Sequence, residues 1–242
     1  MPQLELNHLT LTYKQQMLFD DFSLAFESSL WSSLLGPSGT GKTTILRLLA
    51  GLSTGGELSK KSRIVSPKHE IAYLSQQNCL LPWLTTLENV LLGYQLRASL
   101  TQEIKHQAVE LLDRVGLANA LHKKPTELSG GMQQRAALAR TLLENKPIIL
   151  LDEPFSALDV ITKMKLQTLA ADLLRDKTVI LVTHDPLEAL RLSHHIFILA
   201  GEPARMTKQI TLKSIPPRDI HEPNLLALQA ELLDELTEAA LK

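Results

Sequence analysis

The sequence predicts an α/β fold with a mostly parallel β-sheet that is covered by helices on both faces. Two uninterrupted apolar runs, residues 148–151 and 179–182, have the composition of strands that are buried on both sides. A third apolar segment, 30–35, leads into a glycine-rich turn, after which the apolar residues have helical spacing. Strands that alternate with helices along the chain are typical of an α/β architecture.

The bulk composition is that of a globular protein without a membrane span. The 242 residues are 44% hydrophobic and 21% charged, which is sufficient for a buried core. The longest apolar run covers only residues 196–200, whereas a transmembrane helix needs about 20 residues. A net charge of −1 gives no sign of a nucleic-acid surface, and the single cysteine, Cys79, excludes an intrachain disulfide. Without a recognisable secretory signal, we expect a cytoplasmic protein that binds no nucleic acid.

The first third of the chain contains the remaining predicted strands. Apolar residues alternate with polar ones over residues 4–13, and a second run of this kind follows at 22–26. Residues 53–68 are polar and are expected to form a loop or short edge strands. Residues 71–74 have the composition of one further strand.

Helices are predicted in the second half of the chain. The segment 101–116 has one apolar stripe, a plausible N-cap at Thr101 and a stop at Gly116, and a second helix is expected at 130–145. Prolines then mark a linker-like stretch. A terminal amphipathic helix is predicted by the spacing of Leu225, Leu228, Leu232, Leu236 and Ala239.

The glycine-rich turn carries the full pattern of a phosphate-binding loop. Glycines let successive backbone N–H groups face phosphate oxygens, and the following helix directs its positive end at the same anion. Lys42 is suited to reach the β- and γ-phosphates, and Thr43 offers a hydroxyl to Mg²⁺. A chance glycine turn would not need the buried strand before it and the helix after it. We therefore predict a site for ATP and Mg²⁺ with the loop residues Gly36, Pro37, Ser38, Gly39, Thr40, Gly41, Lys42, Thr43 and Thr44.

Two carboxylates follow the buried run 148–151. Asp152 and Glu153 would lie at the carboxyl end of a strand, where ligands bind in open α/β sheets. Asp152 is suited to hold Mg²⁺, directly or through water, and Glu153 could act as the general base that polarises the attacking water. Such a pair is often only a solvated turn, and the phosphate-binding loop upstream is what favours the catalytic interpretation.

A second potential anion site lies in the segment Ser129-Gly130-Gly131. Ser129 is the predicted N-cap of the helix 130–145, and the glycines leave its first N–H groups uncovered. The segment has no lysine of its own, and by itself it could be an ordinary capped helix. One domain rarely needs two anion sites for one nucleotide, so we expect this one to face the γ-phosphate held by another subunit.

The run Leu128-Ser-Gly-Gly-Met-Gln-Gln-Arg135 resembles the signature motif of the ABC ATPase family. The resemblance covers nearly the whole chain. It implies a P-loop NTPase core with a mostly parallel sheet, an N-terminal antiparallel β-subdomain and an α-helical signature subdomain at about 78–145. The ATPase domain would then occupy residues 1–201, and residues 202–242 would form a C-terminal extension that contains the amphipathic helix.

The resemblance also implies roles for single residues. Tyr13 resembles the aromatic residue that stacks on adenine, and Asp159 resembles the aspartate of the D-loop, which crosses the dimer interface. Gln76 resembles the glutamine that contacts Mg²⁺ and the γ-phosphate region, with Gln77 as the neighbouring alternative. His184 resembles the switch histidine that contacts the γ-phosphate, and with Lys42, Gln76 and Glu153 it completes the expected catalytic set. Taken alone, Tyr13 would be assigned to the core and His184 to a structural role.

The run Leu80-Leu-Pro-Trp-Leu-Thr-Thr-Leu-Glu-Asn-Val90 resembles the ATPases of nitrate, taurine and sulfonate importers and of importers for thiamine precursors. This resemblance implies a homodimer on nucleotide binding, transmembrane permease subunits and a periplasmic or extracellular substrate-binding protein. The chain would be peripheral, on the cytoplasmic face of the inner membrane. Its tail is too short for the regulatory domain of sugar-importer ATPases, and residues 52–75 lack the family's usual hairpin.

Two alternatives to an importer are considered. An ATPase of an exporter or a lipoprotein-release complex shares every catalytic motif. A soluble ABC ATPase that acts on DNA or ribosomes is less favoured, because such relatives have a long coiled coil or two cassettes in one chain.

Overall fold

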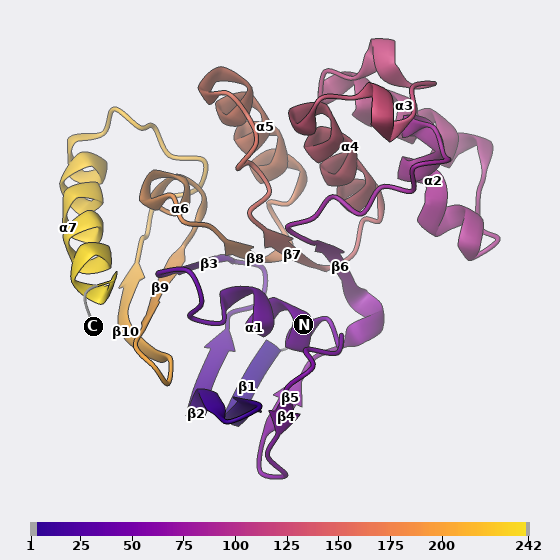
Figure 1. The fold of residues 1–242 in the computed structure, drawn as a ribbon. Coiled ribbons are helices and arrows are strands. Elements are labelled where there is room, and N and C mark those ends of the chain that lie inside the picture. The colour runs from indigo at the N-terminus through magenta and orange to yellow at the C-terminus, as the bar shows by residue number, and fades with distance from the viewer. Residues whose placement is uncertain (1–3, 241–242) are drawn as a thin grey trace.

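A computed structural model describes residues 4–240 of the chain, so the outermost residues of the two predicted domain ranges, 1–3 and 241–242, lie outside the described residues (Figure 1). Its central sheet has six strands in the order β10-β9-β3-β8-β7-β6, parallel except for β10. The predicted α/β class with a mostly parallel sheet is confirmed. The strands are β3 Trp31–Leu35, β6 Ile71–Leu74, β7 Ile148–Asp152, β8 Thr178–Val182, β9 His195–Ala200 and β10 Arg205–Thr211.

The apolar runs of the sequence are the strands at the centre of this sheet. Successive side chains of a strand point to opposite faces, so a strand that is covered on both faces needs apolar residues throughout. In β7, Ile148 and Leu150 pack in one hydrophobic cluster, whereas Ile149 and Leu151 pack in another on the opposite face. The predicted strands at 148–151 and 179–182 are therefore confirmed with both faces buried.

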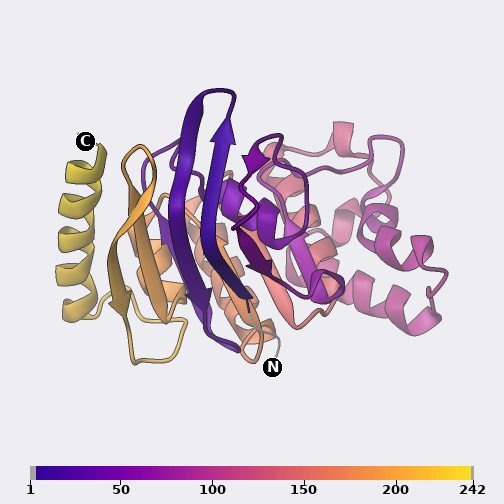
Figure 2. The same cartoon turned by 90° about the horizontal axis from the view of Figure 1, so that it is seen from below.

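A smaller antiparallel sheet covers one face of the central sheet, as Figure 2 shows. Its long hairpin confirms the strands expected near the N-terminus, and the polar segment 53–68 contributes two short strands. The first helix is packed in the same hydrophobic cluster as residues of both sheets. These elements are β1 Leu4–Tyr13, β2 Gln16–Phe26, α1 Lys42–Leu49, β4 Glu57–Leu58 and β5 Arg63–Val65.

Three helices extend beyond the β6 edge of the central sheet and pack on one another (Figure 1). The predicted cap at Thr101 is present, since its hydroxyl accepts a hydrogen bond from the amide of Ile104, and Gly116 lies just beyond the helix with φ 72°. The first of the three was not predicted, although Thr85 and Glu88 form a capping box at its start. These helices are α2 Thr86–Leu96, α3 Gln102–Arg114 and α4 Gly130–Leu143.

Two further helices, α5 Val160–Leu173 and α6 Pro186–Leu192, were also not predicted. The apolar residues of α5 point in several directions, because Val160 is exposed whereas Leu166 is buried. Such a helix has no single apolar stripe that the sequence could reveal. The described residues also include short 3₁₀ helices, η1 Lys68–Glu70, η2 Ala118–Ala120 and η3 Pro125–Glu127.

The segment predicted as a C-terminal extension, 202–242, begins with a strand of the main sheet. β10 pairs antiparallel with β9, so the first part of this range is an edge strand. The predicted terminal helix is present as α7 Pro223–Ala240, which packs against α6 and β9. The division of the chain after residue 201 stays a prediction. Within residues 4–240, no helix is both long and apolar enough to cross a membrane.

We expect α7 to contribute to the stability of the fold through its buried face. Leu232 is 0% exposed, whereas the adjacent Leu233 is 48% exposed. A Leu232→Ala substitution should therefore lower the free energy of unfolding by about 2–5 kcal/mol, and Leu233→Ala by less than about 0.5 kcal/mol. Urea denaturation of the two variants measures the difference. Equal losses would show that α7 does not dock through this face.

Candidate nucleotide-binding site

The phosphate-binding loop connects the end of β3 with the start of α1. The ammonium group of Lys42 donates hydrogen bonds of 2.7 Å to the carbonyl oxygens of Gly36 and Pro37. Burial lowers the pKa of Lys42, while Glu153 and Asp152 act in the opposite direction. Lys42 is a buried cation at a helix N-terminus, and among residues 4–240 its ammonium group is bonded only to carbonyl groups of its own loop, so it is well placed to bind an anionic phosphate.

Two glycines of this loop are required by its geometry. Gly36 has φ 150°, and a Cβ atom there would collide with the carbonyl oxygen of Leu199. Gly41 has φ 83°, and a Cβ atom there would lie 2.5 Å from the ring of Phe19. Any side chain would push the loop away from the strands beneath it, so these positions admit only glycine.

The loop opens into a cavity of about 480 Å³ between the two sheets. This size is within the range of small-molecule sites. The cavity brings half of the predicted site residues together, including Tyr13 from β1, Gln76 after β6 and Glu153 after β7. Its lining consists of Tyr13, Gln16, Leu18, Ser38, Gly39, Gly41, Lys42, Thr43, Thr44, Gln76, Glu153 and Val182.

Oxygen atoms converge beside this cavity at the end of β7. The hydroxyl of Thr43 donates to one carboxylate oxygen of Asp152 at 3.0 Å, and the phenol of Tyr73 donates to the other at 3.3 Å. Burial raises the pKa of Asp152, and these two hydrogen bonds oppose that shift. One hydroxyl and one carboxylate are the oxygen donors that Mg²⁺ uses when nucleotide phosphates and water complete its shell. Within residues 4–240, no three His, Cys, Asp or Glu side chains form a cluster that could hold a metal ion.

Glu153 occupies an unusual backbone conformation with φ 51°. Its amide donates to the carbonyl oxygen of Val182 at 2.9 Å, which continues the pairing of β7 with β8. The structure brings His184 next to it, with Nδ1 of His184 3.7 Å from a carboxylate oxygen of Glu153. The two side chains come from the ends of neighbouring strands, where the sequence analysis expected them.

The predicted second anion site does not line this cavity. Ser129, Gly130 and Gly131 form the start of α4, where the Ser129 hydroxyl accepts a hydrogen bond from the Met132 amide. Asp159 caps α5 in the same way, and the hydrogen bond from the Thr162 amide lowers its pKa. These residues therefore do not belong to the phosphate site of their own chain.

Among the residues of the phosphate-binding loop, Thr40 points inward and donates to the carbonyl oxygen of Pro37.

Several residues that shape the site were not predicted from the sequence. Gln16 and Leu18 line the cavity from the start of β2, and Tyr73 holds Asp152. Gln134, in the middle of α4, contacts the backbone of Glu153. No sequence signal identified them, because these contacts depend on how distant segments pack.

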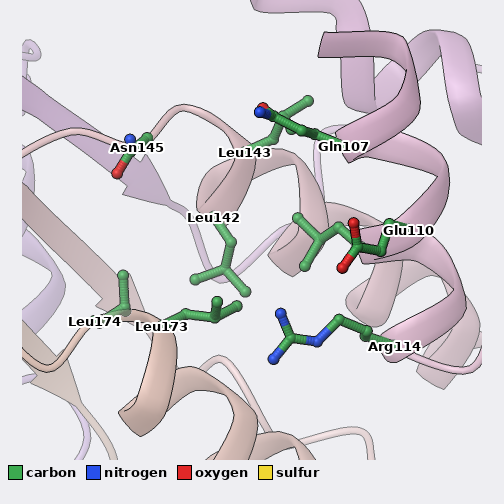
Figure 3. Close-up of a pocket in the computed structure, with 9 residues that line it drawn as sticks. Gln107, Glu110, Arg114, Leu142, Leu143, Asn145, Leu173 and Leu174 are labelled. Atoms are coloured by element: carbon green, nitrogen blue, oxygen red, sulfur yellow. The ribbon is translucent and has the colours of Figure 1, made fainter. Parts of the chain in front are cut away.

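A different cavity, of about 290 Å³, lies between α3 and the ends of α4 and α5 (Figure 3). Leucines from α4 and α5 form its apolar wall, and Glu110 and Arg114 of α3 border it. None of the predicted site residues lines it. We therefore take the cavity of the phosphate-binding loop as the candidate site.

The fold and this site define a P-loop ATPase. The chain matches the family model described as "ABC transporter" over residues 19–156. It is 47% identical to an uncharacterized ABC transporter ATP-binding protein of Haemophilus influenzae, over 94% of this chain and 96% of that protein. The chain thus belongs to the ABC transporter family, as an ATP-binding subunit that hydrolyses ATP.

Other relatives have more informative names. The chain is 38% identical to the aliphatic sulfonates import ATP-binding protein SsuB 2 of Burkholderia cenocepacia, over 96% of this chain and 87% of that protein. It is also similar to a solved dimeric structure of the ATP-binding cassette MJ0796 in a post-hydrolysis state with ADP and Pi. That match has a TM-score of 0.75 and 33% identity, and it covers 87% of this chain and 99% of the other.

Proposed function

We propose that this chain is the ATP-hydrolysing motor of a membrane importer for a small organic solute. The observation that carries the proposal is the cavity that unites the phosphate-binding loop with Gln76 and Glu153. The exposed side chain of Trp83 follows Gln76 closely in the chain. Similarity to sulfonate-import ATPases supports the direction of transport. The substrate is then a sulfonate, or alternatively another solute of such importers: taurine, a thiamine-precursor pyrimidine or the inorganic ion nitrate.

We assign the reaction steps to residues of the cavity. Lys42 and the backbone N–H groups of residues 38–44 bind the β- and γ-phosphates, and Tyr13 stacks on the adenine ring. Thr43, Gln76 and Asp152 hold Mg²⁺, which neutralises phosphate charge when bound. Glu153 accepts a proton from the attacking water, and His184, 3.7 Å from the Glu153 carboxylate, contacts the γ-phosphate.

Catalysis in this proposal requires two copies of the chain. Ser129, Gly130 and Gly131 lie at a helix N-terminus outside their own phosphate cavity. A helix N-terminus favours an anion, and this segment has no lysine of its own. We infer that they bind the γ-phosphate held by a second copy, with Asp159 at the same interface. The dimeric form of the similar cassette MJ0796 supports this arrangement.

The permease would bind beside Gln76. A cavity of about 410 Å³ there is lined by Gln76, Gln77 and Cys79 and also by Thr43 and Asp152, so it adjoins the proposed Mg²⁺ site. Trp83 nearby in the chain is 66% exposed, yet its loop is fixed, because the buried Asn89 amide hydrogen-bonds the backbone of Leu81 and Leu84. A large exposed aromatic side chain on a rigid loop is typical of a protein-binding hot spot.

We expect Trp83→Ala to weaken recovery of the permease. Removal of a central aromatic anchor costs about 2 kcal/mol or more, which is roughly a 30-fold loss of affinity. The measurement is co-purification of the tagged chain from detergent-solubilised membranes, with mass spectrometry of the integral membrane proteins recovered. Leu96→Ala is the matched control, since Leu96 is 79% exposed at the far end of α2.

The same purification tests the whole proposal. Recovery of an integral membrane protein with many apolar spans, together with a substrate-binding protein, would support the importer. It would also support a position on the cytoplasmic face of the inner membrane. Recovery of an export or lipoprotein-release complex would overturn the direction of transport. Ribosomes or DNA in place of a permease would overturn the transport function.

A further inference from the structure

We propose that Gln134 is a positioning residue that ties the signature helix α4 to the catalytic carboxylate of Glu153. Its amide nitrogen donates to the carbonyl oxygen of Glu153 at 2.9 Å and to the hydroxyl of Ser156 at 3.2 Å. Its amide oxygen accepts a hydrogen bond of 2.9 Å from the backbone N–H of Ala157. One side chain of α4 thus holds both ends of the turn that follows β7.

The backbone of Glu153 needs such support. Its φ of 51° lies in the left-handed region, which is unfavourable for a residue with a side chain and persists only where the surroundings enforce it. The N–H group of Glu153 is fixed by Val182, and its carbonyl oxygen is fixed by Gln134 and Ser156. Without the Gln134 bond, the Glu153 carbonyl oxygen keeps, among the described residues, only its contacts with Ser156, so the turn can relax and displace the carboxylate in the cavity.

The contact uses every feature of a glutamine amide. Gln134 itself is only 5% exposed, so its amide has little access to water, whereas its partners Ser156 and Ala157 are exposed. A glutamate at this position keeps the acceptor for Ala157 but cannot donate to the carbonyl oxygen of Glu153. A methionine keeps the approximate volume and loses both kinds of bond.

Gln134 connects the start of α4, which is proposed to bind the phosphate of a second copy, with the turn that contains Glu153. The same helix begins at Ser129–Gly131, and Gly131 is so close to this turn that an added Cβ would lie 3.1 Å from the Ala157 carbonyl oxygen. When a second copy's phosphate engages the start of α4, the shift of the helix is passed directly to residues 153 and 157. This inference rests on the proposed role of Glu153 as the base.

The test measures steady-state ATP hydrolysis and hydrogen exchange in the full chain. In Gln134→Met, kcat should fall by about 10- to 100-fold with KM within about twofold, because a misplacement of about 1 Å costs roughly 100-fold in rate. The amide of Ala157 should exchange faster, while the amides of β8 keep their protection. In a Glu153→Gln background, the same change should lower the residual rate by less than about twofold, since the carboxylate it positions is already absent.

Gln167→Met is the matched control. Gln167 is equally buried and hydrogen-bonds Glu188 and Arg191, but it does not contact residue 153. This control should lower the melting temperature without lowering kcat. If Gln134→Met does not fold, Gln134→Glu gives the same test, with the Ala157 amide still protected.

Unchanged kcat in a folded Gln134 variant would overturn the proposal, as would an equal loss of rate in the Glu153→Gln background. The failure of the proposed function looks different. If Glu153→Gln itself hydrolyses ATP at the wild-type rate, the assignment of the base is wrong whatever the Gln134 variants do.

Discussion

A Glu153→Gln variant is expected to hydrolyse ATP about 100- to 10,000-fold more slowly than the wild-type chain, which is the usual contribution of a general base. The substitution removes the proton acceptor but keeps the size of the side chain. It also leaves Lys42 and Thr43 in place, so the affinity for ATP should change little. The variant should therefore stop after ATP binding rather than before it.

Single-turnover hydrolysis together with equilibrium ATP binding measures this effect. Glu103→Gln is the control, because Glu103 is an exposed glutamate on α3. Its substitution removes the same negative charge at a position outside the cavity. A variant with less than a tenfold loss of rate would mean that another group accepts the proton. Loss of ATP binding would mean that Glu153 is a structural residue of the cavity.

A Lys42→Met variant should fail one step earlier, at nucleotide binding. Lys42 is the cation of the phosphate-binding loop, and it is bonded only to the carbonyl groups of Gly36 and Pro37 among the described residues. Loss of a buried charge partner costs about 2–5 kcal/mol, which corresponds to roughly 30- to 5,000-fold weaker binding of ATP. Hydrolysis should fall with it, because the γ-phosphate is no longer held.

Isothermal titration calorimetry with ATP measures this loss. Lys61→Met is the matched control, since Lys61 lies in an exposed loop outside the cavity. The two variants should separate the roles of the site, with Lys42 required for binding and Glu153 for chemistry. Wild-type affinity in Lys42→Met would contradict the assignment of the loop as the phosphate site.

Much of the phosphate site could be predicted because its chemistry is local in sequence. The loop from Gly36 to Thr44 needs glycines where the backbone has positive φ or approaches another strand, and those requirements are visible as a motif. The strand before Asp152 is apolar throughout because both of its faces are buried. In each case the structural requirement and the residues that reveal it lie in one short segment of the chain.

The remaining features depend on contacts between distant segments. β10 was not recognised, because Arg205–Thr211 is a mostly exposed edge strand without a clear apolar alternation. Only its pairing with β9 identifies it as a strand. The helix α5 lacks a single apolar stripe, so its spacing gave no signal. Tyr73 contacts Asp152 from the neighbouring strand β6, and Gln134 contacts Glu153 from helix α4, and no spacing within the sequence encodes these contacts.

The central claim is that two copies of the chain enclose ATP, each supplying the start of α4 to the other's phosphate. Light scattering of Glu153→Gln with and without ATP and Mg²⁺ tests it most directly. We predict the mass of one chain, 26.9 kDa, without nucleotide and twice that mass with ATP, with Ser129→Arg preventing the change. A Glu153→Gln chain that binds ATP but keeps the mass of one copy would contradict the account.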